Sequence, residues 1–334
     1  MSITVIRPGL LTTIQDLGRY GYQKYGVIVS GAMDPYALRV ANLLAGNPEG
    51  EAVLEITLLG PALKFDADAL IAVTGGDLSP VIDGKPVPLW RPVYITKDSV
   101  LQFGASKSGC RSYLAVAGGF GIGEVMGSKS TYLRAGIGGF DGRALAAGDV
   151  LAINSPQNDL DEWLAQLVKQ GPNHPFLSTS WYAGTEHSLS GSAPVSVRAM
   201  RGSQYEQFSA AAQTALWNGE FKVTPQADRM GYRLTGPALE LAEPLEMVSE
   251  AVALGTIQVP PDGNPIILLA DRQTTGGYPK IAQVAAVDAA KVAQVKPGGK
   301  IKFTEITVAE AARLYREREK RIECLRTAIK MKHL

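Results

Sequence analysis

This chain contains an imperfect internal repeat, in which four short sequence patterns follow the same order in each half. They are GPAL at 60–63 and 236–239, DG-x-P at 83–86 and 262–265, AGGF at 117–120 matched by TGGY at 275–278, and GDVLAI at 148–153 matched by GGKIKF at 298–303. One tetrapeptide can recur by chance, but four in a common order indicate internal duplication. The chain is therefore predicted to contain two similar halves.

Helix signals precede the first repeated sequence in both halves. Asp34-Pro35 is typical of a helix N-cap and first turn, and a second helix is expected to start with a capping box of Ser203 and Glu206. Their apolar faces are predicted to be Leu38, Ala41 and Leu44 before a stop at Gly46, and Phe208, Ala211, Ala212 and Ala215. The 36 glycines and 20 prolines favour short strands joined by turns. The predicted fold is mainly β with a few helices, as two tandem β-barrel domains related by internal duplication.

The repeat also sets the expected domain boundaries, which are 1–155 for the first barrel and 195–306 for the second. A linker over 156–194 is expected to hold a helix from about Leu160 to Val168. A C-terminal helix over 307–334 is predicted from a capping box of Thr307 and Glu310 and from an apolar stripe of Val308, Ala311, Tyr315, Ile322, Leu325 and Ile329. Its other face is basic, so it is either a solvated surface or a site for a partner or an anionic surface.

The composition is that of an ordinary globular protein and excludes several classes of function. Apolar residues make up 46% of the 334 residues, and the formal net charge is +1, so no overall field recruits nucleic acid or a membrane surface. Cys110 and Cys324 are far apart and form no disulfide framework. No secretory signal and no apolar run of about 20 residues is found. A cytoplasmic location is expected.

Several catalytic and cofactor motifs are missing from the sequence. There is no phosphate-binding G-x-x-x-x-G-K-[ST] loop, no G-x-S-x-G elbow, and no G-x-G-x-x-G that opens a strand–helix unit. The histidines, His174, His187 and His333, show no metal-ligand spacing. No metal site is predicted, and any nucleotide chemistry would need a partner.

Polar side chains are concentrated after an apolar segment, Ile266 to Leu269, that reads as a buried strand. The catalytic candidates of this region are Asp271, Gln273 and Glu250. The candidates for binding a substrate or anion are Arg229, Arg233, Gln258, Arg272, Thr274, Thr275, Gly276, Gly277 and Tyr278. Gly276-Gly277 can aim successive N–H groups at an anion, and Gly231 can let the backbone approach a ligand. The structural alternatives are an Asp–Arg salt bridge and a simple turn.

The N-terminal half contains a second polar, glycine-rich stretch at 13–34. Its possible site contributors are Arg19, Ser30 and Asp34, with Asp16 nearby. Asp34 is expected first as a helix cap, and the segments SGAMD and GSKSTY are candidates for lining a site.

These segments together resemble the allophanate hydrolase subunit 2, or biotin-dependent carboxyltransferase-like, family. The resemblance extends from about Ile3 to Phe303 and rests on QDLGRYGY, GVIVSGAMD, ANLLAGN, LEITLLGP, GCRSYLAVAGG, MGSKSTY, DRMGYRL, GTIQVPPDG and DRQTTGGYP. It implies cyclophilin-like β-barrel domains. Within this family the chain most resembles the C subunits of 5-oxoprolinases. These C subunits are also described as antagonists of the histidine-kinase inhibitor KipI.

The resemblance also implies an activity that needs other chains. The C subunit of that branch works with the B subunit, which is a KipI-like protein, and with the A subunit. The three use ATP with Mg²⁺ to convert 5-oxo-L-proline to L-glutamate through a phosphorylated lactam. Biotin is not expected, because the chain has no biotinylation domain. Two alternatives remain open: a regulator that sequesters KipI in sporulation control, and a carboxyltransferase-type component acting on an amide.

Overall fold

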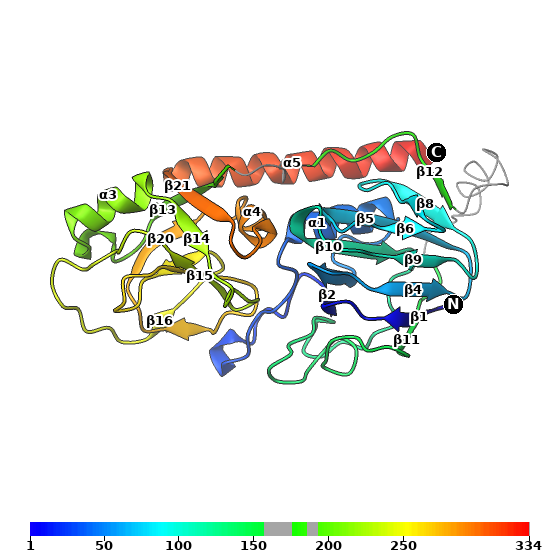
Figure 1. Cartoon of the computed structure of the whole chain (residues 1–334), viewed down its shortest axis with the longest axis horizontal. Coiled ribbons are helices and arrows are strands. Elements are labelled where there is room, and N and C mark those ends of the chain that lie inside the picture. Colours follow the sequence, from blue (N-terminus) through cyan, green and yellow to red (C-terminus); the bar gives the residue numbers. More distant parts are fainter. Residues whose placement is uncertain (157–175, 186–192, 334) are drawn as a thin grey trace. The chain divides into compact units, whose positions relative to one another are not determined.

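The computed structural model describes residues 1–156, 176–185 and 193–333 (Figure 1). The chain divides into two compact units. The N-terminal unit contains Met1–Arg19, Ser30–Ser190 and Ile322–Leu334, and the C-terminal unit contains Tyr20–Val29 and Gly191–Arg321. The helix expected over 160–168 lies outside the described residues.

The N-terminal unit is built on two six-stranded sheets, in the orders β11-β1-β4-β9-β6-β7 and β12-β8-β5-β10-β3-β2. The strands are β1 (Ser2–Arg7), β2 (Leu11–Gln15), β3 (Val53–Thr57), β4 (Ala62–Phe65), β5 (Ala69–Asp77), β6 (Val81–Ile82), β7 (Lys85–Pro86), β8 (Pro92–Ile95), β9 (Val100–Gln102), β10 (Ser108–Val116), β11 (Val150–Ala152) and β12 (Phe176–Ser178). Side chains from both sheets form one buried apolar cluster, for example Phe65 and Leu101 from the first and Leu54 and Leu114 from the second.

Helix α1 (Pro35–Leu44) packs against the second sheet. The Asp34 side chain accepts a hydrogen bond from the Ala37 N–H, so the predicted N-cap is confirmed. The buried face of α1 joins an apolar cluster with residues of β3, β5 and β10, and with Ile322 and Ile329 near the end of α5 (Val308–His333). The second sheet is therefore covered by apolar residues on both faces.

The C-terminal unit contains a closed barrel of seven strands, in the order β13-β20-β17-β18-β15-β14-β21. These strands are β13 (Val195–Arg201), β14 (Phe221–Val223), β15 (Gly231–Thr235), β17 (Thr256–Gln258), β18 (Ile266–Leu268), β20 (Lys280–Val284) and β21 (Lys300–Glu305). A parallel pairing of β13 with β21 closes the barrel, and the other pairings are antiparallel. A separate two-stranded sheet joins β16 (Glu250–Ala251) to β19 (Thr275–Gly276). The prediction of a mainly β fold with a barrel is confirmed.

The helix predicted to begin at Ser203 starts later. A short 3-10 helix, η2 (Tyr205–Gln207), comes first, and α3 (Ala210–Asn218) is capped by Ser209, whose side chain accepts from the Ala212 N–H. Glu206 pairs with Arg201 instead of completing a capping box. The apolar face was also partly wrong, since Ala212 and Leu216 are buried whereas Ala211 is exposed.

The remaining helices of the described residues are η1 (Gln23–Tyr25), α4 (Ala289–Gln294) and α5. The predicted cap of α5 is confirmed, because the Thr307 hydroxyl accepts from the Glu310 N–H at 3.1 Å. The predicted stripe holds only in part, since Ile322 and Ile329 are buried but Val308 and Tyr315 are exposed. None of the described helices has the length and apolar composition needed to cross a membrane.

The repeated sequences occupy comparable places in the two units. Both DG-x-P sequences lie in hairpins, between β6 and β7 and between β17 and β18, and both late glycine turns lead into a strand, β11 or β21. GPAL follows β3 in one unit and β15 in the other, but the second unit has an extra strand, β14, between helix and GPAL. Internal duplication stays a prediction.

Candidate functional site

The polar loop predicted after the buried strand follows β18 in the C-terminal unit. The apolar run continues past the strand, because Leu269, Ala270 and Asp271 are buried as well. Two backbone hydrogen bonds tie this extension to the segment before β15: Leu269 N–H donates to the Met230 carbonyl and Asp271 N–H to the Arg229 carbonyl, both at 2.9 Å. The polar loop from Arg272 onward therefore begins at a backbone segment, residues 269–271, that is held in place by hydrogen bonds; we call this segment the base of the loop.

Arg229 and Asp271 form a buried ion pair at this base. The guanidinium donates from Nε and Nη2 to the two carboxylate oxygens at 2.9 and 3.0 Å, and each residue is only 5% exposed. This two-point geometry is the strong form of an arginine–carboxylate contact. The structure thus realises the salt-bridge alternative, and the predicted roles of Asp271 as a base and of Arg229 in binding an anion stay predictions.

Arg272 has a different environment from Arg229. Its Nη1 donates to the Leu269 carbonyl at 3.2 Å, and no carboxylate of the described residues forms an ion pair with it. Burial lowers the pKa of the Arg272 guanidinium below its ordinary value, with a smaller opposing effect of Tyr20. A partly buried cation without a counter-charge is costly, so this position favours an anionic ligand.

The two glycines of the loop pack closely but do not form an anion-binding turn. Neither Gly276 nor Gly277 has the positive φ that an alternating N–H nest requires, and Gly276 pairs with Glu250 between β19 and β16. A Cβ on Gly276 would lie 2.6 Å from Nε2 of the buried Gln258, which donates to the Tyr278 carbonyl at 3.0 Å. The nest prediction was wrong, since Gly276 makes room for the Gln258 amide.

The glycine at 231 also differs from its prediction. A Cβ there would meet the Ile267 carbonyl oxygen at 3.0 Å, so Gly231 allows β15 and β18 to approach each other. Arg233 follows on β15 and is exposed between the buried Tyr232 and Leu234, so its side chain points out of the barrel. Arg233 takes no part in the contacts described above.

Glu250 is held by a lysine that the sequence reasoning did not select. Lys280 Nζ donates to the Glu250 carboxylate at 2.8 Å and to the Ala251 carbonyl at 3.0 Å. The hydrogen bond and charge of Lys280 lower the pKa of Glu250, which makes this carboxylate a weaker base than an isolated one. Lys280 could have been found, because it directly follows the GGYP sequence of the loop.

The other loop residues are open to solvent to different degrees. Gln273 and Thr275 are exposed and Thr274 is half-buried, with its carbonyl accepting from the Val252 N–H. Tyr278 is 43% exposed and ends the loop. The residues that follow Arg272 along the loop thus supply amide, hydroxyl and phenol groups.

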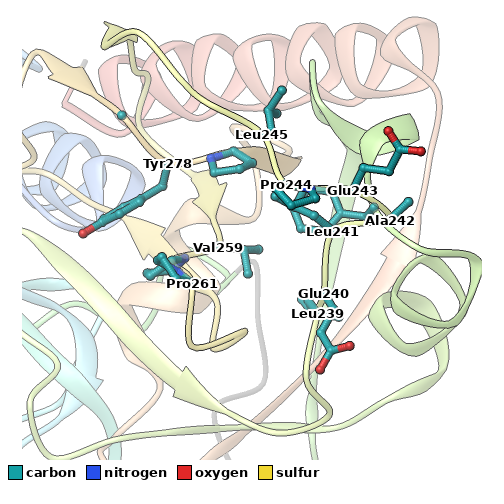
Figure 2. Close-up of a pocket in the computed structure, with 14 residues that line it drawn as sticks. Leu239, Glu240, Leu241, Ala242, Glu243, Pro244, Leu245, Val259, Pro261 and Tyr278 are labelled. Carbon is teal, nitrogen blue, oxygen red and sulfur yellow. The ribbon is translucent and has the colours of Figure 1, made fainter.

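A pocket of 540 Å³ adjoins the end of this loop (Figure 2). Its walls come from residues 239–245, 259–261 and 277–279, together with Phe208. Figure 2 shows Leu241 and Pro244 on one side and Val259 and Pro261 opposite, with Tyr278 at an edge. The pocket is therefore largely apolar, and the sequence reasoning missed it because its walls are brought together only by the fold.

In the N-terminal unit, Asp16 and Arg19 form hydrogen bonds with the backbone of the segment 125–131. The Asp16 carboxylate accepts from the Lys129 N–H at 2.6 Å. Arg19 is fully buried and donates to the carbonyls of Val125 and Ser130 at 2.8 and 3.0 Å. The predicted contributor Arg19 therefore acts on backbone carbonyls in this structure.

Ser30 and Asp34 lie in the same unit. Ser30 donates to the Thr131 carbonyl at 3.1 Å and has φ of 59°, a conformation that non-glycine residues rarely adopt. Asp34 caps α1, as expected. The SGAMD and GSKSTY segments are thus brought together, but their use as a ligand site stays a prediction.

Sequence reasoning also missed a buried polar cluster on β3 and β10. The Tyr113 hydroxyl donates to Glu55 at 2.9 Å and accepts from the Asp34 N–H at 2.8 Å, while Glu55 also accepts from the Met33 N–H. Arg111 lies 3.9 Å from Glu55. Burial, reinforced by the charge of Glu55, raises the pKa of Tyr113 well above its ordinary value. Charged residues within otherwise apolar strands were the signal that could have revealed this cluster.

Neither unit offers an evident metal centre in the part of the chain that the structure describes. No three His, Cys, Asp or Glu side chains are grouped there in a way that could hold an ion. A nucleotide's phosphates would find a cation at Arg272, but the described loop supplies no glycine nest for them.

Comparison with known proteins agrees with the resemblance found in the sequence. The family model of the carboxyltransferase domain, subdomain A and B, matches residues 25–305. The chain is 40% identical to the 5-oxoprolinase C subunit of Haemophilus influenzae, with 96% of each protein covered, and 38% identical to that of Escherichia coli, with 97% of each covered. The solved structure of K. lactis urea amidolyase is 30% identical, with a TM-score of 0.85 over 96% of this chain and 20% of that one. The chain therefore belongs to the carboxyltransferase domain, subdomain A and B, family.

Proposed function

We propose that this chain is the C subunit of an ATP-dependent 5-oxoprolinase and is active only with its partners, the A and B subunits. The near full-length similarity to two proteins named as the C subunit of 5-oxoprolinase supports this role. The observation that carries it in the structure is Arg272, a partly buried guanidinium with no carboxylate partner among the described residues. The substrate carboxylate and a transferred phosphoryl group both need such a cation.

The proposed chemistry follows from the weak reactivity of a lactam. Transfer of the γ-phosphoryl group of ATP, with Mg²⁺, to the lactam oxygen forms a P–O bond and releases ADP. Water then adds to the activated carbon, the ring C–N bond breaks with the nitrogen taking a proton, and a second water releases phosphate to leave L-glutamate. Charge stabilisation dominates such phosphoryl transfers. Arg272 would hold a developing negative charge, and the Arg229–Asp271 pair would keep the loop in position.

The test is glutamate release that requires both ATP and 5-oxoproline, measured for the chain alone and after addition of each partner. We expect turnover only in the complete complex. Arg272→Ala should lower kcat by about 100-fold without dissociating the complex, since removal of one preorganised charge contact has effects of that size. Arg272→Lys should recover a part of the activity because it restores charge but not the planar fork.

Alanine at Arg233 or Gln273 tests the remaining loop predictions in the same assay. Loss of turnover with an intact complex would support their assignment, and near-normal turnover would remove them from the site. If Arg272→Ala turns over normally, the anion-binding role of the loop is wrong.

A second candidate function is a carboxyltransferase component acting on an amide. The match to a carboxyltransferase-domain family and the likeness to urea amidolyase favour it. It predicts dependence on a biotinylated partner and bicarbonate, so avidin should abolish that activity. The KipI-regulator alternative predicts instead that a loop variant without turnover still relieves the inhibited kinase.

A further inference from the structure

The pocket beside the loop has an apolar interior, and we name it the groove. Its walls include Leu241, Pro244, Val259 and Pro261, and it shares Tyr278 with the proposed site loop. In Figure 2 the carboxylate of Glu243 and the hydroxyl of Tyr278 point away from this apolar centre. A small polar metabolite would find few groups to orient it there, because such ligands are usually fixed by convergent polar atoms.

The rim of the groove carries an unbalanced negative charge. Among the residues that the structure describes, no lysine or arginine lines the groove, whereas Glu240 and Glu243 do. The segment 239–250 contains four glutamates and no basic residue. Lys280 compensates Glu250, but Glu240, Glu243 and Glu246 form no ion pair within the described residues. An occupant with a positive charge beside an apolar group is therefore complementary to this surface.

The rim also offers free backbone groups. Residues 243–249 are mostly exposed, and among the described residues no backbone hydrogen bond uses their N–H groups. Such a segment can pair with the main chain of another polypeptide, in the way that exposed extended segments bind peptides. Main-chain pairing would supply affinity, and the groove would supply selection of a side chain.

We propose that the groove receives an exposed segment of a partner protein in which a bulky apolar side chain is followed or preceded by a lysine or arginine. The apolar side chain fills the space between Leu241 and Val259, and the cation pairs with Glu240 or Glu243. This inference rests on the proposed function only in taking the partner to be the B subunit of the same complex. Because Gly277, Tyr278 and Pro279 form one wall, the partner would lie beside the site loop.

Two exposed apolar residues on the same segment provide a matched test. Leu245 lines the groove and is 36% exposed, whereas Val248 does not line it and is 86% exposed. Leu245→Arg should weaken binding of the purified B subunit, measured by titration calorimetry, by about tenfold or more, as expected for a central interface contact. Val248→Arg should leave the Kd within about twofold. Melting of each variant by circular dichroism checks that the barrel remains folded.

A charge reversal tests the rim separately. The double variant Glu240→Lys, Glu243→Lys should slow association with the B subunit and remove its dependence on ionic strength, since rim charges act mainly on the association rate. Glu246→Lys, which does not line the groove, should have a smaller effect. Equal effects of the matched variants, or an unchanged Kd for Leu245→Arg, would overturn the proposal.

Other occupants give distinct results. If the chain alone is a dimer in sedimentation velocity and Leu245→Arg makes it a monomer, a second copy occupies the groove and the proposal is wrong. The proposed function fails separately: a complex that forms through the groove but releases no glutamate refutes only the 5-oxoprolinase assignment. Unchanged affinity together with normal turnover refutes only the groove.

Discussion

Arg229 and Arg272 differ sharply in their electrostatic surroundings although both lie next to the base of the same loop. The Asp271 carboxylate accepts two hydrogen bonds from Arg229. Arg272 instead donates to the Leu269 carbonyl, and it is partly buried without a carboxylate partner among the described residues. A buried, paired charge holds structure in place, while a buried charge without a partner reduces stability unless a ligand compensates it. Removal of the charge should therefore reduce stability much more at Arg229 than at Arg272.

This difference can be measured by replacing each arginine with methionine, which has a similar length to the aliphatic part of arginine but carries no charge. Arg229→Met removes the two hydrogen bonds that the buried Asp271 carboxylate accepts from the guanidinium, and we expect a loss of about 3 kcal/mol in the free energy of unfolding. Arg272→Met removes only a desolvated charge and should change stability by less than about 1 kcal/mol, in either direction. Urea unfolding of the isolated chain at pH 7 gives both values. A large loss for Arg272→Met would show that its charge has a structural partner.

At the scale of secondary-structure elements, the β16–β19 pair depends on a glycine packed against a buried amide. A Cβ at Gly276 would lie 2.6 Å from Gln258 Nε2, whereas at Gly277 the nearest atom is 3.4 Å away, an ordinary contact. Gly276→Ala should therefore destabilise the chain by about 2 kcal/mol, because the Gln258–Tyr278 hydrogen bond must shift. Gly277→Ala should be nearly neutral. Thermal melts of the two variants make the comparison, and equal melting temperatures would contradict the packing role of Gly276.

The junction of β13 and α4 should show its own pH dependence. Burial opposes the charge of Asp288, but hydrogen bonds from Arg198 and the charge of Lys291 outweigh it, so the pKa of Asp288 is lowered. Asp288 accepts from the Arg198 backbone N–H and from its Nε, at 2.8 and 2.9 Å. A lowered pKa gives stability that is present above the unfolded value, about 3.9, and is lost as pH falls through the folded value.

Asp288→Asn should therefore lower the free energy of unfolding by about 2 kcal/mol at pH 6, since a charge-assisted bond is lost. The difference from the wild type should begin to narrow as pH falls below the unfolded value of about 3.9, because the unfolded carboxylate then takes up a proton before the native one does. Urea unfolding at several pH values follows this difference. A constant difference from pH 6 to pH 3 would mean that Asp288 does not contribute through its ionisation.

At the scale of the whole molecule, patterns along the chain predicted the mainly β fold, α1 and a barrel, whereas the functions assigned to single residues stay predictions. The N-cap at Asp34 and the glycine turns are local signals, so they were found. The late start of α3 was missed because both Ser203 and Ser209 can cap a helix. The sequence alone does not show that the backbone becomes α-helical only after Ser209. The Arg229–Asp271 pair and the groove depend on segments that are distant in sequence, which no local pattern specifies.

The division into units also predicts how fragments of the chain should behave. All seven strands of the closed barrel lie between Val195 and Glu305, and a closed barrel leaves no unpaired edge. The N-terminal unit instead includes β12 and the end of α5, which supplies Ile322 and Ile329 to the cluster around α1. A fragment of residues 193–321 should therefore fold on its own, whereas a fragment of residues 1–156 lacks part of its core.

We expect the 193–321 fragment to be soluble and to melt cooperatively by circular dichroism, with dispersed amide resonances. The 1–156 fragment should expose the apolar face of α1 and bind the dye ANS, as partly packed states do. Replacing Ile322 and Ile329 by alanine in the full chain should reproduce part of this effect, at about 3 kcal/mol for each buried isoleucine. A cooperative, wild-type-like melt of the 1–156 fragment would mean that the end of α5 contributes little to the N-terminal unit.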